Sequence, residues 1–529
     1  MSFESLLAAV IANPEDDVLR LAFADWFEEN GQSERAEFIR VQIERARLQA
    51  DDPRQSELMH REIVLLAEHG REWFGFPSND YLIFRRGFVE GLALHPAHKL
   101  QIDEIFRAHP IRELRLVGTE SGDGARLAER PELARIERLW IDSAVVEPNA
   151  YDEVKSLLAS KWWRNVRMLR LRTAFAEDDL RTIFSHPGFA NLRELQINFG
   201  AADLVIDALT AFPNLPLESL WVHPGQWGTC SLTDTSLTKL ATSPIWKHLR
   251  ELDVGVAPFD GVSSPRFSRV LGRSNLRTLR VRSWYMSNGS AEECVANLLA
   301  AKSWGRLESL TLGYIGFNAD RLLTHPKLSQ LRTLNLYRNT TAEDLTDRLF
   351  TCSDLAGLRE LRVDMPCTSP VLASRKARPM NGLRSLQASL STEAIQALST
   401  SPHFKQLRCL HLNPVATEGV KALARSTSLP SLNRVLVVCQ DDAKPTAADV
   451  AKFADRSAFP NLGQVWFNGG RWGRTSVAAI LKRGSIPWPL LSSRALDAAA
   501  HERRNTRALG LGGFQPPLDE RFDPTWDGE

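Results

Sequence analysis

The stretch "IRELRLVG", residues 111–118, decides the fold, because variants of it return along most of the chain. The copies begin at Ile111, Ile136, Val166, Leu192, Leu217, Leu249, Leu276, Leu307, Leu331, Leu358, Leu383, Leu407, Leu432 and Leu462. The first and last of these 14 copies start 351 residues apart, so the 13 intervals between them average 27 residues. Self-similarity at such a period predicts a solenoid.

Each copy carries apolar residues at its first, fourth and sixth positions, and the last two alternate with a polar or variable residue. This alternation predicts one short, half-buried strand per copy. The segments between copies, such as residues 176–191 and 392–406, have apolar residues spaced by three and four and reach a Pro, which predicts a helix. One unit cannot bury its own apolar face, so the units stack, with the strands in a parallel sheet on one side and the helices on the other. Because a helix is wider than a strand, we expect the stack to curve with the strands inside.

Residues 88–470 resemble the leucine-rich repeat family, in particular its ribonuclease-inhibitor-like class, which has a helix in every repeat. The recurring lead-in "P-x-[FLW]-x-x-L-R-x-L" carries the resemblance together with the three apolar positions. It implies an α/β solenoid: a curved leucine-rich-repeat array with a parallel inner sheet and outer helices, preceded by a small helical N-terminal domain. Position 9 departs from the family pattern of Asn or Cys, since it holds Thr119, Ala144, Ala174, Gly200 and Gly225. We therefore expect few side-chain ladders in the turns, and loop insertions in the longer intervals.

The head of the chain lies outside the repeats and predicts a helical hairpin. "NPEDDVLRLAFADWFEENG" places Pro14 and acidic residues at a helix start and Asn30-Gly31 at its end, and residues 32–48 form a second helix. We expect a small core in which residues of the first helix pack against the second. Its members are Leu19, Leu21, Phe23, Trp26 and Phe27 on one side and Phe38, Ile39 and Ile43 on the other.

Residues 1–48, notably "LRLAFADWFEENG" followed by "RAEFIRVQ", look like the repeat-companion domain that heads large families of bacterial repeat proteins. The resemblance implies architecture and no activity. We expect four parts: this domain at 1–48, a helical connector or N-terminal cap at 49–87, the solenoid at 88–483, and a C-terminal cap with a disordered tail at 484–529. The head is either a cap over the first strand of the array or a separate docking module.

Composition excludes several classes of function. The chain has 529 residues with 65 Lys and Arg against 64 Asp and Glu, so its net charge of +1 gives no general attraction to nucleic acid or to an anionic membrane. No apolar stretch reaches the length of a membrane span, and the N-terminus lacks the basic region of a signal peptide. The six cysteines are scattered without disulfide or metal spacing. We expect a cytoplasmic, monomeric protein that binds neither membrane nor nucleic acid.

The chain contains no recognisable catalytic motif. It has 12 histidines but no HExxH and no GxSxG, and the glycines of "ALGLGGF", residues 508–514, lack the Lys-Ser/Thr of a phosphate-binding loop. The acidic residues Asp16, Asp17, Asp25, Glu28 and Glu29 fit a solvated helix face better than a carboxylate site. We therefore expect no catalytic residues, no metal and no cofactor.

The variable positions of the inner sheet carry the functional signal. Position 5, between the two core residues, is predicted to point away from the core, and Trp and Arg are frequent there; position 7 shares its face. Such side chains dominate interface energies, although aromatic residues also pack on one another along a sheet. The predicted partner-binding residues of this concave face are Trp140, Arg170, Arg172, Trp221, His223, Arg280, Arg282, Tyr337, Arg362, His411 and Trp466.

Position 2 is Arg in nine copies: Arg112, Arg167, Arg193, Arg250, Arg277, Arg332, Arg359, Arg384 and Arg408. Stacked in register, these residues form a basic ridge that attracts phosphate or an acidic partner. Glutamates at positions 2 and 3 of neighbouring copies favour the other interpretation, a charge-paired structural ladder.

Two classes of function follow. The first is a non-enzymatic scaffold that binds a protein partner on the concave face. The alternative is an adaptor or regulatory subunit of a catalytic or signalling complex, in which the head or an inserted loop provides a small-ligand or weak catalytic site. A pocket with a titrating group of shifted pKa would favour the alternative.

Overall fold

A computed structural model of the protein describes most of the chain up to residue 468 and a short segment after it. The described residues are 2–48, 52, 54–75, 82–94, 102–117, 122–142, 150–172, 175–198, 202–223, 234–256, 271–272, 274–283, 298–299, 301, 303–313, 319–337, 345–367, 370–373, 375–440, 448–449, 452–455, 457–462, 464–468 and 489–491. They divide into two compact units. The described part of the first unit lies within residues 2–172 and 186–191, and that of the second within 175–185 and 192–491.

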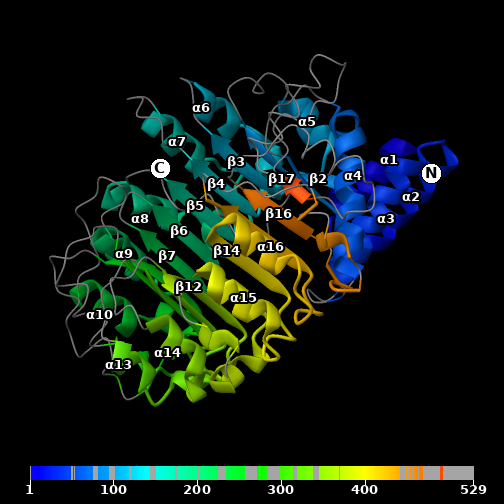
Figure 1. The fold of residues 1–529 in the computed structure, drawn as a ribbon. Coiled ribbons are helices and arrows are strands. Elements are labelled where there is room, and N and C mark those ends of the chain that lie inside the picture. Colours follow the sequence, from blue (N-terminus) through cyan, green and yellow to red (C-terminus); the bar gives the residue numbers. More distant parts are fainter. Residues whose placement is uncertain are drawn as a thin grey trace. The chain divides into compact units, whose positions relative to one another are not determined.

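Four helices form the head of the first unit: α1 (Phe3–Ala12), α2 (Asp17–Glu29), α3 (Ser33–Arg47) and α4 (Arg54–Phe74), drawn in blue in Figure 1. The Asp16 carboxylate caps α2 by accepting a hydrogen bond from the Val18 amide at 2.8 Å. After α2 the chain turns at Gly31, whose φ of 77° suits glycine. The helices predicted on either side of this turn are therefore confirmed.

The head has two apolar clusters where the sequence predicted one. The first joins α1, α2 and α3 with Phe88, and in it Phe23 stacks on Phe27 with ring centroids 4.7 Å apart. Phe38 does not belong to it, so that part of the predicted core is wrong. Phe38 instead packs with Leu65 and Leu66 of α4 in the second cluster, because it projects from the opposite side of α3.

A β-hairpin follows the head and packs against it. Strands β1 (Leu82–Arg85) and β2 (Phe88–Leu94) pair antiparallel around a turn at Arg86 and Gly87. Gly87 has φ 89°, and a Cβ there would lie 2.2 Å from Ile39 Cγ1 of α3. Only glycine permits so close an approach of the turn to the helix.

The repeats of the first unit begin at β2. Strands β3 (Glu113–Val117), β4 (Arg138–Asp142) and β5 (Met168–Arg172) follow β2 in parallel, with Leu92, Leu114, Leu139 and Leu169 in register. Helices α5 (Ile102–Ala108), α6 (Asp123–Ala128) and α7 (Ala150–Leu158) stand between these strands. The lead-in motif forms short 3₁₀ helices that begin with Pro, η2 (Pro131–Arg135) and η3 (Pro187–Phe189). Proline suits the first turn because that position needs no amide donor.

The second unit continues the same pattern over a longer stretch. Its strands are β6 (Glu194–Asn198), β7 (Ser219–His223), β8 (Glu251–Val256), β9 (Thr278–Ser283), β10 (Ser309–Gly313), β11 (Thr333–Tyr337), β12 (Glu360–Cys367), β13 (Ser385–Leu390), β14 (Cys409–Val415), β15 (Arg434–Cys439), β16 (Gln464–Asn468) and β17 (Pro489–Leu491). Each pairs in parallel with the next. The described helices are α8 (Glu177–Ser185), α9 (Ala202–Thr210), α10 (Asp234–Thr242), α13 (Ala319–Leu323), α14 (Leu345–Thr351), α15 (Thr392–Thr400) and α16 (Thr417–Leu423). Their 3₁₀ counterparts are η4 (Pro244–Lys247), η5 (Leu328–Gln330), η6 (Ser353–Leu355), η7 (Pro370–Ala373), η8 (Arg375–Gly382) and η9 (Lys452–Ala454).

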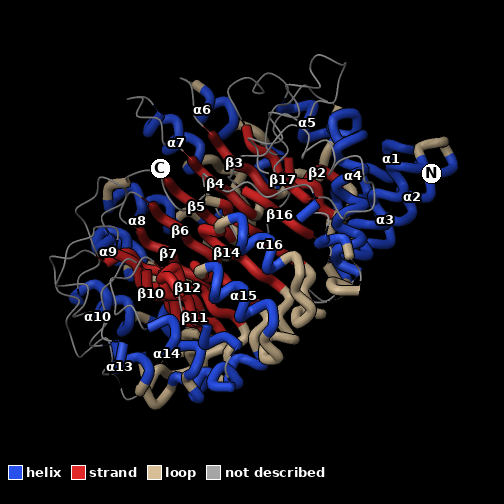
Figure 2. The backbone as a smooth tube through the Cα atoms, in the orientation of Figure 1, coloured by secondary structure: helices blue, strands red, loops and turns tan. Residues whose placement is uncertain are grey.

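The core of the repeats lies between the strands and the helices. Side chains at positions 4 and 6 are buried along both runs of strands, as are the inward residues of the helices, for example Ile183 and Phe184 of α8. Figure 2 shows helices flanking the red strands of the second unit. Each of the 14 predicted copies contains a strand, so the α/β solenoid is confirmed.

Some expectations fall outside the described residues. These are the position 9 residues of the first copies, most of the longer intervals, and residues 492–529. Within the predicted cap and tail segment, β17 adds one more parallel strand beside β16.

Candidate functional site

The candidate site lies on the sheet face opposite the helices, which we call the helix-free face. Because the strands pair without a shift at these positions, residues at position 5 stack into a column across the sheet, and those at position 7 form a second column beside it. In the first unit, column 5 contains Ala93, Arg115, Trp140 and Arg170. In the second it contains Gln196, Trp221, Asp253, Arg280, Thr311, Asn335, Arg362, Gln387, His411, Leu436 and Trp466.

The predicted site residues are more buried than an open surface would leave them. Arg170 is only 8% exposed and His223 only 2%. Seven others are half-buried: Trp140, Arg172, Trp221, Arg280, Arg282, Arg362 and His411. Most of these side chains are therefore only partly open to solvent. In the clusters below, the reason is that side chains on adjacent strands are close enough to cover one another. The side chains of Tyr337 and Trp466 lie outside the described part.

In the first unit, Trp140 is held between two guanidinium groups, an arrangement we call the tryptophan sandwich. Arg115 and Arg170 stand on the strands on either side, with their Cζ atoms 4.2 and 4.8 Å from the indole centroid. A guanidinium over an indole face is a favourable cation–π contact. The sandwich presents a fixed aromatic group flanked by two positive charges.

In the second unit, five residues of β7, β8 and β9 form what we call the Asp253 cluster: Trp221, His223, Asp253, Arg280 and Arg282. The fully buried Asp253 is at its centre. Its Oδ2 accepts a hydrogen bond from Arg282 Nη2 at 2.8 Å, and its Oδ1 lies 3.0 Å from His223 Nε2. Arg280 lies with its Cζ 5.2 Å from the centroid of the Trp221 ring, so it reaches across the intervening strand.

The electrostatics of this cluster keep Asp253 ionised. Burial alone would raise the pKa of its carboxyl, but Arg282, His223 and Arg280 lower it to about 2. A buried carboxylate surrounded by donors is stable only because these groups compensate its desolvation. Asp253 therefore fixes the positions of the basic side chains around it.

Asp253 occupies position 5 of its copy, but sequence reasoning did not select it as a site residue. The available signal was its place in the repeat. Asp253 stands at position 5 between Trp221 and Arg280 of the two adjacent copies. His223 and Arg282 each follow one of these neighbours by two residues. Other selected residues stand apart from the cluster. Arg362 Nε, for example, lies 3.8 Å from Asp364 Oδ1.

The arginines at position 2 support the structural interpretation of the ridge. Arg112, Arg193 and Arg277 each face the glutamate of the next copy, with nitrogen–oxygen distances of 2.8, 2.6 and 4.0 Å to Glu137, Glu218 and Glu308. Arg332 and Arg359 donate to backbone carbonyls of the following lead-in, those of Gly357 and Gly382. These five side chains thus link neighbouring repeats.

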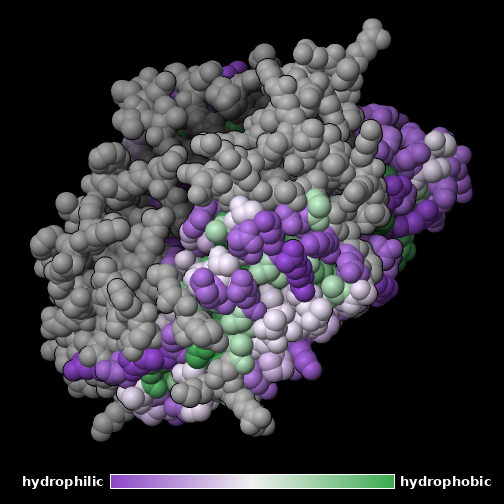
Figure 3. Space-filling view, in the orientation of Figure 1, coloured by the Kyte–Doolittle hydropathy of each residue, from purple (hydrophilic) through white to green (hydrophobic). Residues whose placement is uncertain are grey.

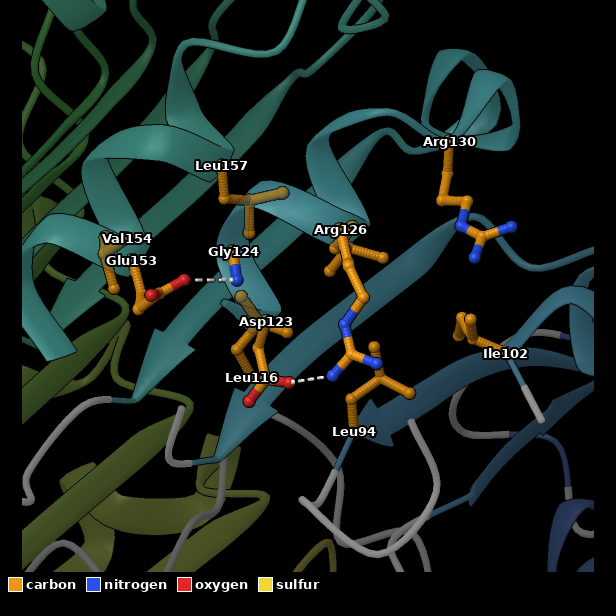
Figure 4. Close-up of a pocket in the computed structure, with 11 residues that line it drawn as sticks. Leu94, Ile102, Leu116, Asp123, Gly124, Arg126, Arg130, Glu153, Val154 and Leu157 are labelled. Carbon is orange, nitrogen blue, oxygen red and sulfur yellow. Dashed lines mark hydrogen bonds and ion pairs between the residues drawn. The ribbon is translucent and has the colours of Figure 1, made fainter. Parts of the chain in front are cut away.

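The first unit also contains a pocket of about 60 Å³ (Figure 4). Leu94 and Leu116 belong to its apolar lining. At its polar end the Glu153 carboxylate accepts hydrogen bonds from the amides of Gly122 and Gly124 at 2.5 and 2.7 Å. The protein's own carboxylate thus already occupies these donors, and the volume is small for an organic ligand.

Outside the helix-free face, the described surface of the head is charged and polar. The acidic face of the head carries ion pairs, such as that of Arg40 with Asp25 and Glu28, and the visible surface of these helices is mostly hydrophilic (Figure 3). Within the described ranges, no group of three or more His, Cys, Asp or Glu side chains is placed to hold a metal ion. None of the described helices has both the length and the apolar composition needed to cross a membrane.

No protein-family model and no curated protein matches the sequence. Solved structures do show similarity. The structure of the Rad7 and Elc1 complex in yeast matches with 13% identity over 84% of this chain and 96% of that one, at a TM-score of 0.37. An internalin (inlF) of Listeria monocytogenes matches with 15% identity over 66% and 80%, at 0.27. Human 5T4, the trophoblast glycoprotein, matches with 16% identity over 51% and 80%, at 0.23.

At these identities and TM-scores the similarities carry no argument about function. The strand register and the helix in most described repeats define the class, an α/β solenoid of leucine-rich-repeat-like architecture. The resemblance of residues 1–48 to the repeat-companion domain stays a prediction.

Proposed function

We propose that the protein is a non-enzymatic interaction scaffold that binds a partner protein on the helix-free face. One observation carries the proposal: two tryptophan–arginine clusters, the tryptophan sandwich and the Asp253 cluster, occupy columns 5 and 7 of that face. Trp and Arg are the residue types that contribute most to binding energy at protein interfaces.

The sheet supports this role by preorganisation. Parallel pairing fixes the backbone of each strand, and the side-chain contacts restrict Trp140 and Trp221 before any partner arrives. A surface that is already ordered loses less conformational entropy on binding. Because the two indoles are half-buried, a partner would contact the exposed edges of fixed groups.

A pull-down from the native cytosol tests the proposal with the Trp140→Ala/Trp221→Ala variant. We expect this variant to lose at least about tenfold in affinity for the captured protein, since truncating a buried interface tryptophan typically costs about 2 kcal/mol or more. Trp162→Ala is the matched control, because Trp162 is also half-buried but follows α7 outside columns 5 and 7. If the double variant and the control retain the captured protein equally, the proposal is contradicted. This comparison requires that both variants have the melting temperature of the wild type.

A further inference from the structure

We propose that the Asp253 cluster binds an oxyanion group, a carboxylate or a phosphate, that the partner protein presents to Arg280 and Arg282. This inference rests on the proposed function and names the chemistry of the partner. The site is built from three adjacent strands, β7, β8 and β9, within the second unit.

The first support is that Arg280 has unused donors. A guanidinium has five N–H groups, and that of Arg280 makes no hydrogen bond to any described residue. Its Nη1 is buried, yet it lies 3.8 Å from Glu251 and 4.0 Å from Asp253, both beyond hydrogen-bond distance. The Arg280 side chain as a whole is 25% exposed, so a ligand can approach it and supply the acceptor that its guanidinium lacks.

The second support is that Asp253 does not act as that acceptor, since Arg280 Nη1 lies 4.0 Å from its Oδ2. Its Oδ2 is engaged by Arg282 at 2.8 Å and its Oδ1 lies 3.0 Å from His223. The carboxylate therefore holds Arg282 in place and leaves the neighbouring Arg280 to a different anion. Trp221, beneath the Arg280 guanidinium, orients it from the other side.

The third support is that the neighbours of Arg282 in column 7 have no side chains. In column 7, its neighbours on β8 and β10 are Gly255 and Gly313. Neither adjacent strand therefore places a side chain next to Arg282 at that level of the sheet.

The donors of the cluster favour an oxyanion over a cation. Arg282 is paired with the buried Asp253 at 2.8 Å, whereas Arg280 lies 3.8 Å from the half-exposed carboxylate of Glu251 and so keeps donors for a further acceptor. Arginine presents paired donors in the geometry that carboxylates and phosphates accept. The site thus matches an acidic or phosphorylated segment of a protein.

Fluorescence anisotropy with defined peptides tests the inference. The probes are a rhodamine-labelled glutamate-rich peptide, its phosphoserine version and its glutamine version, with inorganic phosphate as a separate competitor. We expect the glutamate or the phosphoserine peptide to bind and the glutamine peptide not to bind. Whichever anionic peptide binds more tightly identifies the oxyanion as a carboxylate or a phosphate. The Arg280→Gln/Arg282→Gln variant should weaken binding at least about tenfold, the usual effect of losing charge-assisted hydrogen bonds.

Arg277→Gln is the matched control, because Arg277 directly precedes β9 and carries the same charge at position 2, away from the cluster. If the double variant misfolds, Arg280→Gln alone replaces it, since this side chain makes no hydrogen bond that the described fold needs. Equal weakening by Arg277→Gln overturns the inference, and so does the absence of binding by both anionic peptides up to about 1 mM. Binding of inorganic phosphate alone would show an adventitious anion and likewise overturn it.

Binding of the partner captured in the pull-down distinguishes a failure of this inference from a failure of the proposed function. If the partner is lost by Trp140→Ala/Trp221→Ala but fully retained by Arg280→Gln/Arg282→Gln, the oxyanion site is wrong and the proposed function stands. If neither variant loses the partner, both are wrong.

Discussion

At the scale of single residues, Arg20 shows how a buried charge connects parts of the first unit. Its side chain is fully buried in α2, and its guanidinium donates to the carbonyls of Pro14, Arg85 and Arg86 and to Glu90 Oε1 at 2.6 Å. Pro14 precedes the helix, whereas the other three acceptors belong to the β1–β2 hairpin. One side chain therefore ties the head to the first strands of the array.

Arg20→Met should destabilise the first unit by about 3–5 kcal/mol, because it leaves Glu90 buried without its main partner. Arg20→Met/Glu90→Met should cost clearly less than the single change, since no unpaired charge remains. Urea unfolding followed by tryptophan fluorescence measures both. A cost below about 1 kcal/mol for the single variant would show that the ion pair does not hold the hairpin to the head.

Single residues are also where sequence reasoning was weakest. The column in which each site residue lies follows from the repeat pattern, and this was predicted correctly for Trp140, Trp221 and Arg280. How deeply a side chain is buried depends on which residue the next strand places beside it. For the same reason, the period did not reveal that Asp253 lies at the centre of a cluster or that Gly255 lies beside Arg282.

At the scale of elements, the head packs against the β1–β2 hairpin as a cap would. Phe88 of β2 belongs to the apolar cluster of α1, α2 and α3, and the Gly87 amide donates to Gln42 Oε1 of α3 at 2.6 Å. Glu15, just before α2, reaches Arg86 of the turn and Arg112 ahead of β3, and these contacts lower its pKa to about 2. The contacts favour the cap over a separate docking module.

Deleting residues 1–48 should therefore destabilise the N-terminal strands. Without the head, the apolar side of the β1–β2 hairpin is exposed, and nearest-neighbour coupling in a solenoid transmits the loss inward. Hydrogen exchange of the truncated protein should show faster exchange in β2, β3 and β4, with little change in β13 and β14. Unchanged protection at Leu114 and Leu139 would contradict the cap and leave the docking module.

The elements themselves were largely predictable. All 14 strands and the two head helices follow from spacing alone, because the periods of two and of three to four residues reflect which side chains must face the core. The antiparallel strand β1 was not predicted. Its residues, Leu82–Arg85, lie outside the repeat and form a strand only because a turn at Gly87 returns them along β2.

At the scale of the whole molecule, most of the chain's regularity serves to hold variable residues in fixed columns. Apolar side chains at positions 4 and 6 and the arginine links at position 2 support the repeats, while columns 5 and 7 vary in a way that the core does not require. Each unit carries one tryptophan–arginine cluster in these columns. The central claim is that a partner protein covers these clusters.

Hydroxyl-radical footprinting of the protein, alone and with its captured partner, tests this claim most directly, because it reports the accessibility of individual side chains. We predict that the oxidation of Trp140 and Trp221 falls when the partner binds. The oxidation of two control residues should stay the same: Trp162, which lies outside the columns, and Val18, which is 71% exposed on the head. Protection of Trp162 or Val18 with unchanged oxidation of both column tryptophans would contradict the account and place the partner elsewhere.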